Sequence, residues 1–167
     1  CIRDSMRAIG LNEGTLNLDG TPTKAYYGHI DLGDGNNNKG IFSGRQGASA
    51  EESNAIYYQQ VNDYADKYRG AVESYGVRLG TQAYDVLMFN IKDLTTQAPL
   101  AVPAFVAQIP DIIAKGISAD SVGFARSEAF AIIRDGQKTY DTTFKTYQEL
   151  LRDQTSRSMT IVTGQRG

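Results

Sequence analysis

Most of the chain after residue 48 carries the spacing of apolar residues that is typical of α-helices. Tyrosines and valines recur at steps of three and four from Tyr57 to Tyr75, and Ser49 and Glu52 precede them at capping-box spacing. The same criteria predict further helical segments at residues 81–94, 104–115, 118–136 and 144–152. Residues 154–167 are predicted to be a polar tail that pairs a short segment with the body.

The first 48 residues have a different pattern, one helix followed by a hairpin. Apolar residues recur at helical spacing in residues 3–12, which predicts an amphipathic helix that stops at Gly14. Residues 23–30 and 40–43 predict two strands. The polar, glycine-rich segment between them predicts a long hairpin loop.

Together these segments predict an α+β fold that is mainly α. A length of 167 residues suits one domain with a sizeable core. We expect two lobes in that domain, with the first helix and hairpin in residues 1–48, a helical bundle in 49–153 and a tail in 154–167. Pockets commonly form between two such lobes, so a cleft is expected there.

Glu13 is the leading candidate for a catalytic residue. It follows the first predicted helix directly, lies beside apolar Ile9 and Leu11, and precedes Gly14. Partial burial and the negative end of the helix dipole would both raise its pKa. A carboxyl that stays protonated near neutral pH can act as a general acid. The alternative is a solvated glutamate at a helix end.

Composition excludes several classes of function. The net charge is −2, so no global basic field indicates nucleic-acid binding, and no apolar run approaches the length of a membrane span. Phosphate-binding glycine loops are absent, and one histidine with one cysteine supports zinc poorly, so neither a cofactor nor a metal is expected. The ten tyrosines suit a sugar or peptide groove, with ordinary core packing as the alternative. We expect a monomer.

Cys1 is the only cysteine and forms no internal disulfide. Its position fits a chain end left by trimming, which is the preferred interpretation, or the lipid-bearing first residue of a bacterial lipoprotein. We expect an extracytoplasmic or secreted protein.

The hairpin segment supplies further candidates. In a strand, Tyr26 and Tyr27 would point to opposite faces, so one of them would line a substrate groove, and His29 would share the face of Tyr27. His29 lies two residues before Asp31, and such a pair could orient a water or a sugar hydroxyl. The alternative is a structural or surface histidine. Because no Gly-x-Ser-x-Gly elbow is present, a serine-hydrolase triad is not expected.

A hydrolase of the two-carboxylate type needs a second carboxylate about 5 to 9.5 Å from Glu13. Asp31 is the first choice because the hairpin should return it to the cleft, Asp34 is the second and Asp19 the third. Asp34 is also a candidate for substrate binding. The loop's closely spaced oxygen ligands could bind calcium, but they do not match an EF-hand, and a turn with local hydrogen bonds is preferred.

Asn90 is a polar residue inside the apolar run of residues 81–94, where Leu87 and Phe89 are expected to carry the packing. Burying its amide requires partners. The expected partners are backbone groups of the hairpin lobe, which would place Asn90 in the substrate site. The alternative is an exposed asparagine on the wet stripe of the helix.

The order of these segments resembles the lysozyme superfamily, in which a helix ends in the catalytic glutamate, a hairpin lobe follows and a helical lobe closes the cleft. Glu13-Gly14-Thr15 resembles the catalytic segment of lambda-type phage endolysins, which are lytic transglycosylases. Residues 40–43 resemble a strand of goose-type lysozymes and soluble lytic transglycosylases. Residues 87–90 resemble a buried helix of phage lysozymes. The familiar phage enzymes also carry an aspartate and a threonine at fixed distances after the glutamate, a spacing that this chain lacks.

The resemblance implies an enzyme that cleaves peptidoglycan, either a muramidase or a lytic transglycosylase. The latter can work with the glutamate alone, because the substrate's own hydroxyl attacks and an anhydro sugar forms. One alternative is a chitinase or chitosanase on the same fold. Another is a non-catalytic binding or structural module, which the mild negative charge favours because many wall-lytic enzymes are basic.

Overall fold

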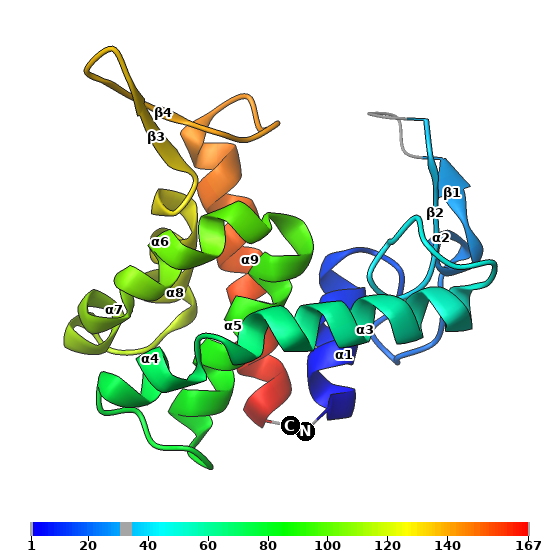
Figure 1. Ribbon diagram of the computed structural model, residues 1–167, viewed down its shortest axis with the longest axis horizontal. Helices are drawn as coiled ribbons and strands as arrows, with labels where there is room; N and C mark the ends of the chain where they lie inside the picture. Colours follow the sequence, from blue (N-terminus) through cyan, green and yellow to red (C-terminus); the bar gives the residue numbers. More distant parts are fainter. Residues whose placement is uncertain (1, 31–34, 167) are drawn as a thin grey trace. The chain divides into compact units, whose positions relative to one another are not determined.

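The computed structural model describes the backbone of residues 2–30 and 35–166 and the side chains of residues 6–30 and 35–163. The chain divides into two compact units, Cys1–Asp66 and Lys67–Gly167 (Figure 1). Helices make up most of both units, and the described residues also form two small antiparallel hairpins. The predicted α+β, mainly α class is therefore confirmed.

The first unit combines helices with one short hairpin. Its elements are α1 (Ile2–Asn12), α2 (Lys24–Tyr27), β1 (His29–Ile30), β2 (Asn37–Asn38) and α3 (Ala50–Asp66). β1 and β2 pair antiparallel, with His29 opposite Asn38. Ile9, Phe42 and Val61 form the centre of its core. The core therefore joins α1, the turn after β2, and α3.

Helix α3 begins where the capping pattern predicts. The Glu52 N–H donates to Ser49 Oγ at 3.2 Å, while the Ala48 N–H donates to Glu52 Oε2 at 3.1 Å. The helix was expected to continue to Tyr75 but ends at Asp66, and the next helix is separate. The division between the two units falls at this break.

The strand predictions in this unit are largely wrong, although the hairpin exists. Residues 24–27 form a helical turn, and of the first predicted strand only His29 and Ile30 pair as a β-strand. Residues 40–43 form a turn because Gly40 and Ser43 adopt left-handed φ values of 79° and 50°. Those values are incompatible with a strand, so β2 lies before the turn.

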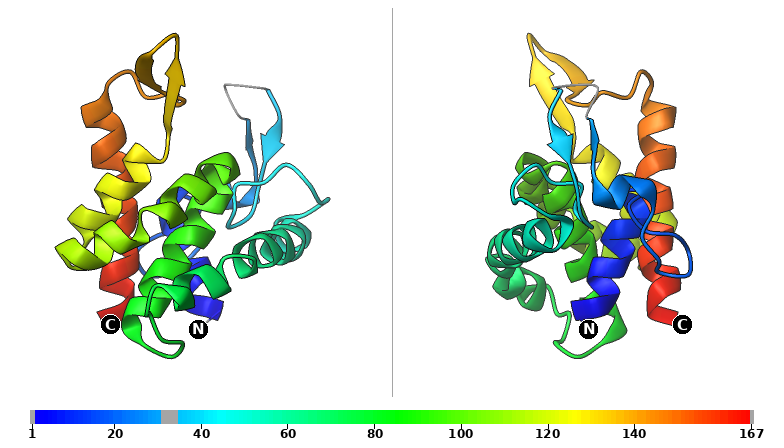
Figure 2. Two further views of the ribbon diagram at one scale, coloured as in Figure 1. Left: turned by 60° about the vertical axis from the view of Figure 1, so that its left-hand side comes forward. Right: turned by 90° about the vertical axis from the view of Figure 1, so that its right-hand side faces the viewer.

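The second unit is built around a helix that is buried over most of its length, α5. The unit contains α4 (Arg69–Ser74), α5 (Gln82–Gln97), the 3₁₀ helix η1 (Pro99–Ala101), α6 (Val102–Ala107), α7 (Ile109–Lys115), α8 (Ala119–Glu128), β3 (Ala131–Arg134), β4 (Gln137–Tyr140) and α9 (Tyr147–Arg166). Helix α9 packs along α8 and also contacts α5 (Figures 1 and 2).

Local capping determines where two of these helices start. The Thr81 hydroxyl accepts the Tyr84 N–H at 3.2 Å at the start of α5. Ser118 accepts the Ser121 N–H at 3.1 Å at the start of α8. Both predicted helix starts are confirmed. The segment predicted at residues 104–115 is helical too, but it is divided into α6 and α7 at Gln108.

The β3–β4 hairpin is a correction to the sequence prediction, which extended the preceding helix to Gly136. The helix ends at Glu128, and β3 and β4 pair from Ala131↔Tyr140 to Arg134↔Gln137. Asp135 and Gly136 form the connecting turn with φ values of 52° and 76°. Asp-Gly is the preferred dipeptide for such a two-residue turn, so the signal was present in the sequence.

The predicted polar tail is also wrong, because α9 continues to Arg166. Gln154, Ser158 and Ile161 are buried, so one stripe of this helix faces the interior of the second unit although much of it is polar. Within residues 2–30 and 35–166, no helix has both the length and the apolar character that crossing a membrane requires.

Candidate active site

Glu13 is the C-cap residue of α1. The Gly14 N–H donates to the Leu11 carbonyl at 3.2 Å, and the Thr15 N–H donates to the Gly10 carbonyl at 2.9 Å. This pair of bonds is the Schellman motif, in which the residue after the cap takes a left-handed conformation. Gly14 has φ 72°. The helix end therefore determines where the half-buried Glu13 side chain leaves the backbone.

Two threonines hold the segment that follows Glu13. The buried Thr15 hydroxyl donates to the Ile41 carbonyl at 2.9 Å. The Thr23 hydroxyl donates to the Gly14 carbonyl at 2.8 Å, and the Thr23 N–H donates to the Thr15 carbonyl at 2.9 Å. The turn that contains Ile41 and the start of α2 are thus hydrogen-bonded to the loop beside Glu13.

His29 connects α2 to the turn after β2. Its Nδ1 lies 3.1 Å from the Ala25 carbonyl oxygen, and its Nε2 lies 3.2 Å from Ser43 Oγ. A carbonyl oxygen only accepts, so this contact assigns the proton to Nδ1. In the neutral imidazole, Nε2 then accepts the Ser43 O–H. Ser43 was not predicted as the partner of His29, because 14 residues separate the two in sequence.

Ser43 occupies a constrained turn. Among the described residues, Ser43 and Asp135 are the non-glycine positions with positive φ, and the β3–β4 turn accounts for Asp135. Gly44, the next residue, pairs with Lys39. The Gly44 N–H donates to the Lys39 carbonyl at 3.0 Å, and the Lys39 N–H donates to the Gly44 carbonyl at 2.7 Å. A Cβ on Gly44 would lie 2.1 Å from the Tyr57 ring, so only glycine fits there. The turn therefore holds Ser43 in place.

Tyr26 and Tyr27 pack against each other edge to face, with ring centroids 5.1 Å apart. The expectation that they point to opposite faces of a strand is wrong, since they are successive residues of a helical turn. The Tyr26 hydroxyl accepts the Asn54 Nδ2–H at 3.1 Å. Tyr27 is 70% exposed, so Tyr27 presents the larger surface to a ligand.

Of the three candidates for a second carboxylate, the structure describes Asp19. Asp31 and Asp34 lie outside the described residues. Asp19 is exposed and accepts hydrogen bonds from the Thr21 hydroxyl at 2.5 Å and the Thr21 N–H at 2.9 Å. These bonds hold the pKa of Asp19 below its ordinary value of 3.8. Asp19 thus stabilises a local turn.

Asn90 lies in the second unit and is fully buried, so its predicted need for partners is confirmed. The predicted partners are wrong. Its Nδ2 donates to the Val86 carbonyl at 2.8 Å, and its Oδ1 accepts from Arg126 Nη1 at 3.0 Å and from the Ser158 hydroxyl at 3.2 Å. Helices α8 and α9 therefore supply the partners that were expected from the hairpin.

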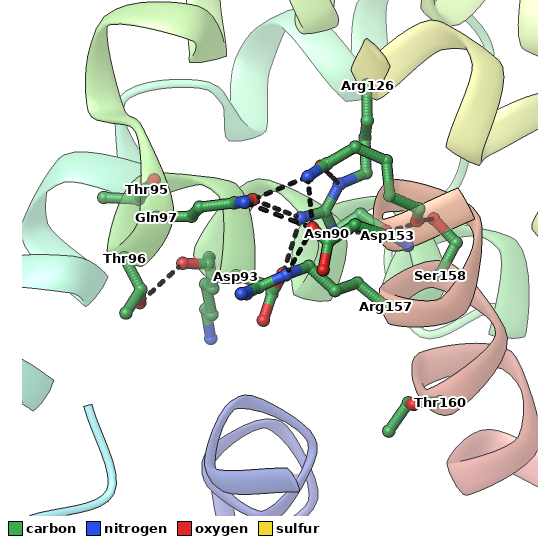
Figure 3. Close-up of polar contacts among 12 residues, drawn as sticks. Asn90, Asp93, Thr95, Thr96, Gln97, Arg126, Asp153, Arg157, Ser158 and Thr160 are labelled. Atoms are coloured by element: carbon green, nitrogen blue, oxygen red, sulfur yellow. Dashed lines mark hydrogen bonds and ion pairs between the residues drawn. The ribbon is translucent and has the colours of Figure 1, made fainter. Parts of the chain in front are cut away.

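Arg126 is the centre of a buried polar network that joins α5, α8 and α9 (Figure 3). Its Nε donates to Gln154 Oε1 at 2.8 Å, and its Nη2 donates to Asp93 Oδ2 at 2.6 Å. Burial lowers the pKa of Arg126, and the Asp93 carboxylate opposes that effect. Among the described residues, every buried side-chain nitrogen and oxygen has a partner. We interpret this network as a structural connection between helices.

The second unit also contains two open hollows. The residues that line the first are Gln82, Ala83, Val86, Ile117 and Val162. Along α9, a more apolar hollow is lined by Gln148, Leu151, Arg152, Thr155, Ser156 and Met159. Neither lining contains a carboxylate or a histidine, so these hollows lack the groups that general acid–base chemistry requires.

No family model, curated protein or solved structure matches this chain. In the first unit, Glu13 and the hydrogen-bonded pair of Ser43 and His29 are groups that can take part in acid–base chemistry.

Proposed function

We propose that this chain is a glycan-cleaving enzyme of lysozyme-like fold that cuts peptidoglycan, with Glu13 as its general acid. The observation that carries the proposal is the position of Glu13 at the C-cap of α1. The Schellman bonds and the two threonine contacts hold the backbone on both sides of a half-buried carboxyl. A general acid must be held in this way to meet the leaving oxygen in a productive geometry.

The proposed chemistry begins with protonation of the glycosidic oxygen by Glu13 as the bond from that oxygen to C1 breaks. Attack by water on C1 gives a reducing end. Attack by the substrate's own hydroxyl gives an anhydro sugar, as in lytic transglycosylases. Asp31 is the proposed second carboxylate for the hydrolytic route.

Substrate contacts are proposed for the segment beside this site. Tyr27 offers an exposed aromatic face, which suits stacking against a sugar ring. Tyr26 supports Tyr27 through the edge-to-face contact and is itself held by Asn54. Asp34 is proposed to contact a substrate hydroxyl, whereas both ring nitrogens of His29 are hydrogen-bonded within the protein, to the Ala25 carbonyl and to Ser43.

The test is release of soluble muropeptides from purified peptidoglycan. Glu13→Gln should reduce the rate by about 100-fold or more, the usual contribution of a general acid, with little change in the thermal midpoint. Glu51→Gln is the matched control, because Glu51 is an exposed glutamate in the first turn of α3. Mass spectrometry of the products distinguishes the two routes, since an anhydro product is lighter by one water.

Three outcomes would contradict the proposal. Full activity of Glu13→Gln would exclude Glu13 as the acid. Cleavage of chitin oligosaccharides without cleavage of peptidoglycan would favour the chitinase alternative. Binding of cell-wall sacculi by the wild type without release of any fragment would favour a non-catalytic module.

A further inference from the structure

The Ser43–His29 pair carries a second inference, which rests on the proposed function. We propose that this pair is the base side of the glycan-cleaving site. Ser43 accepts the hydrogen of the attacking hydroxyl, whether water or a sugar hydroxyl, and passes its own proton to His29. Ser43 is then a catalytic residue that touches the attacking group, and His29 acts through Ser43.

The hydrogen-bond order along the pair gives each atom its role. The Ala25 carbonyl accepts the Nδ1–H of His29, which leaves a lone pair on Nε2. Ser43 Oγ lies 3.2 Å from that nitrogen, so the hydroxyl hydrogen is directed to it. The remaining lone pairs of Ser43 Oγ can accept a hydrogen from a third group. This is the base, its orienting group and the hydroxyl that a proton relay requires.

The protons balance over the proposed step. Glu13 gives one proton to the leaving oxygen, while the attacking oxygen bonds to C1 and loses one proton to Ser43. Ser43 in turn loses one proton to Nε2 of His29. The step ends with a carboxylate and an imidazolium, and solvent returns one proton to Glu13 and removes one from His29 before the next turnover.

The backbone around the turn favours a relay over a serine nucleophile for acyl transfer. Such a nucleophile needs backbone N–H groups to stabilise an oxyanion, usually including that of the next residue. Here the Gly44 N–H donates to the Lys39 carbonyl at 3.0 Å. The N–H groups of Arg45 and Gln46 donate to the Tyr57 hydroxyl at 3.2 and 3.3 Å. A relay requires none of these donors.

The turn that holds Ser43 is hydrogen-bonded to the segment that holds Glu13. Thr15, two residues after Glu13, donates from its hydroxyl to the Ile41 carbonyl at 2.9 Å, and Ile41 lies in the turn of Ser43. Ser43 and His29 are both only half-buried, so a substrate can reach them. The left-handed φ of 50° at Ser43 is a conformation that non-glycine residues rarely keep without a constraint.

The experiment compares two leaving groups. Natural peptidoglycan requires acid assistance, whereas a 2,4-dinitrophenyl glycoside of an N-acetylglucosamine oligomer has a leaving group that departs without it. Ser43→Gly and His29→Ala should each lose about 100-fold or more in kcat on both substrates, with little change in KM. Glu13→Gln should lose activity on peptidoglycan and keep most of it on the aryl glycoside. Free imidazole should restore part of the rate of His29→Ala on either substrate.

Glycine at residue 43 suits the left-handed φ, so Ser43→Gly removes the hydroxyl without straining the turn. Ser74→Ala is the control, since Ser74 is exposed and its hydroxyl donates to the Ala71 carbonyl of its own helix. Wild-type kcat in Ser43→Gly and His29→Ala, with Glu13→Gln inactive on peptidoglycan, would overturn the relay and leave the proposed function standing. Ester hydrolysis with fluorophosphonate labelling of Ser43 would instead make it a nucleophile. An active Glu13→Gln on peptidoglycan would overturn the proposed function itself.

Discussion

Arg126 Nη2 lies 2.6 Å from Asp93 Oδ2, and both side chains are fully withdrawn from solvent. Such a pair costs desolvation free energy that its attraction only partly returns, so it is poor evidence of net stabilisation. Breaking it is a different matter, because the remaining charge would stay buried. Arg157 is partly exposed, and its Nη1 lies 3.4 Å from the same Asp93 oxygen. The Asp93 carboxylate is therefore the counterion of two arginines.

Asp93→Ala should therefore lower the free energy of unfolding by about 3–5 kcal/mol. The measurement is urea unfolding followed by circular dichroism. Asp141→Ala, which changes an exposed aspartate of the same unit, should stay within about 0.5 kcal/mol of wild type. The double variant Asp93→Leu with Arg126→Met should recover most of the loss. A single variant as stable as the wild type would show that Arg126 finds another counterion.

The protonation of Glu128 is expected to lower the stability of the second unit in acid. Burial, the largest single influence, raises its pKa, but hydrogen bonds from Lys138, Tyr147 and Tyr140 together outweigh burial and hold the pKa below the ordinary value of 4.5. A depressed pKa in the folded state contributes stability that is complete above the unfolded value and is lost as the pH falls through the folded value. Burial and the Glu128 carboxylate also raise the pKa of Tyr147 to about 12, so Tyr147 stays a neutral donor in acid.

The thermal midpoint should accordingly be flat from about pH 7 to pH 5 as far as Glu128 is concerned, and fall below about pH 4.5. The control is Glu128→Gln, which cannot titrate. The midpoint difference between wild type and variant should shrink as the pH falls. A difference that stays constant down to pH 3 would mean that the three hydrogen bonds do not favour the charged form.

Local signals predicted part of this fold correctly. The cap residues Thr81 and Ser118 mark helix starts because a side chain satisfies a backbone N–H three residues away. Gly14 likewise marks the end of α1, because glycine can adopt the positive φ that the helix end requires. Such features depend only on neighbours in sequence, so the pattern alone carries them.

Other features depend on partners that are distant in sequence. Gln154 and Ser158 were predicted to lie in a polar tail, but they are buried because they hydrogen-bond to Arg126 and Asn90 of other helices. The four-residue spacing of Gln154 and Ser158 was the sequence signal that they share one face of a helix. Ser43 was equally hidden, because it meets His29 across 14 residues.

Gly14 and Gly70 offer a prediction with opposite signs for the same substitution. Gly14 has φ 72° and a Cβ built on it would touch nothing within 4 Å, so Gly14→Ala carries only the backbone cost of a left-handed alanine. That cost is about 1 kcal/mol of stability. Gly70 lies in α4 without a positive φ and is equally open, so Gly70→Ala should stabilise by about 0.5–1 kcal/mol. Urea unfolding of both variants measures the two effects.

Because Gly14 also sets the direction of the chain after Glu13, Gly14→Ala should slow muropeptide release while Gly70→Ala leaves it unchanged. Two shifts of the same sign would show that the Schellman geometry at the end of α1 does not hold in solution.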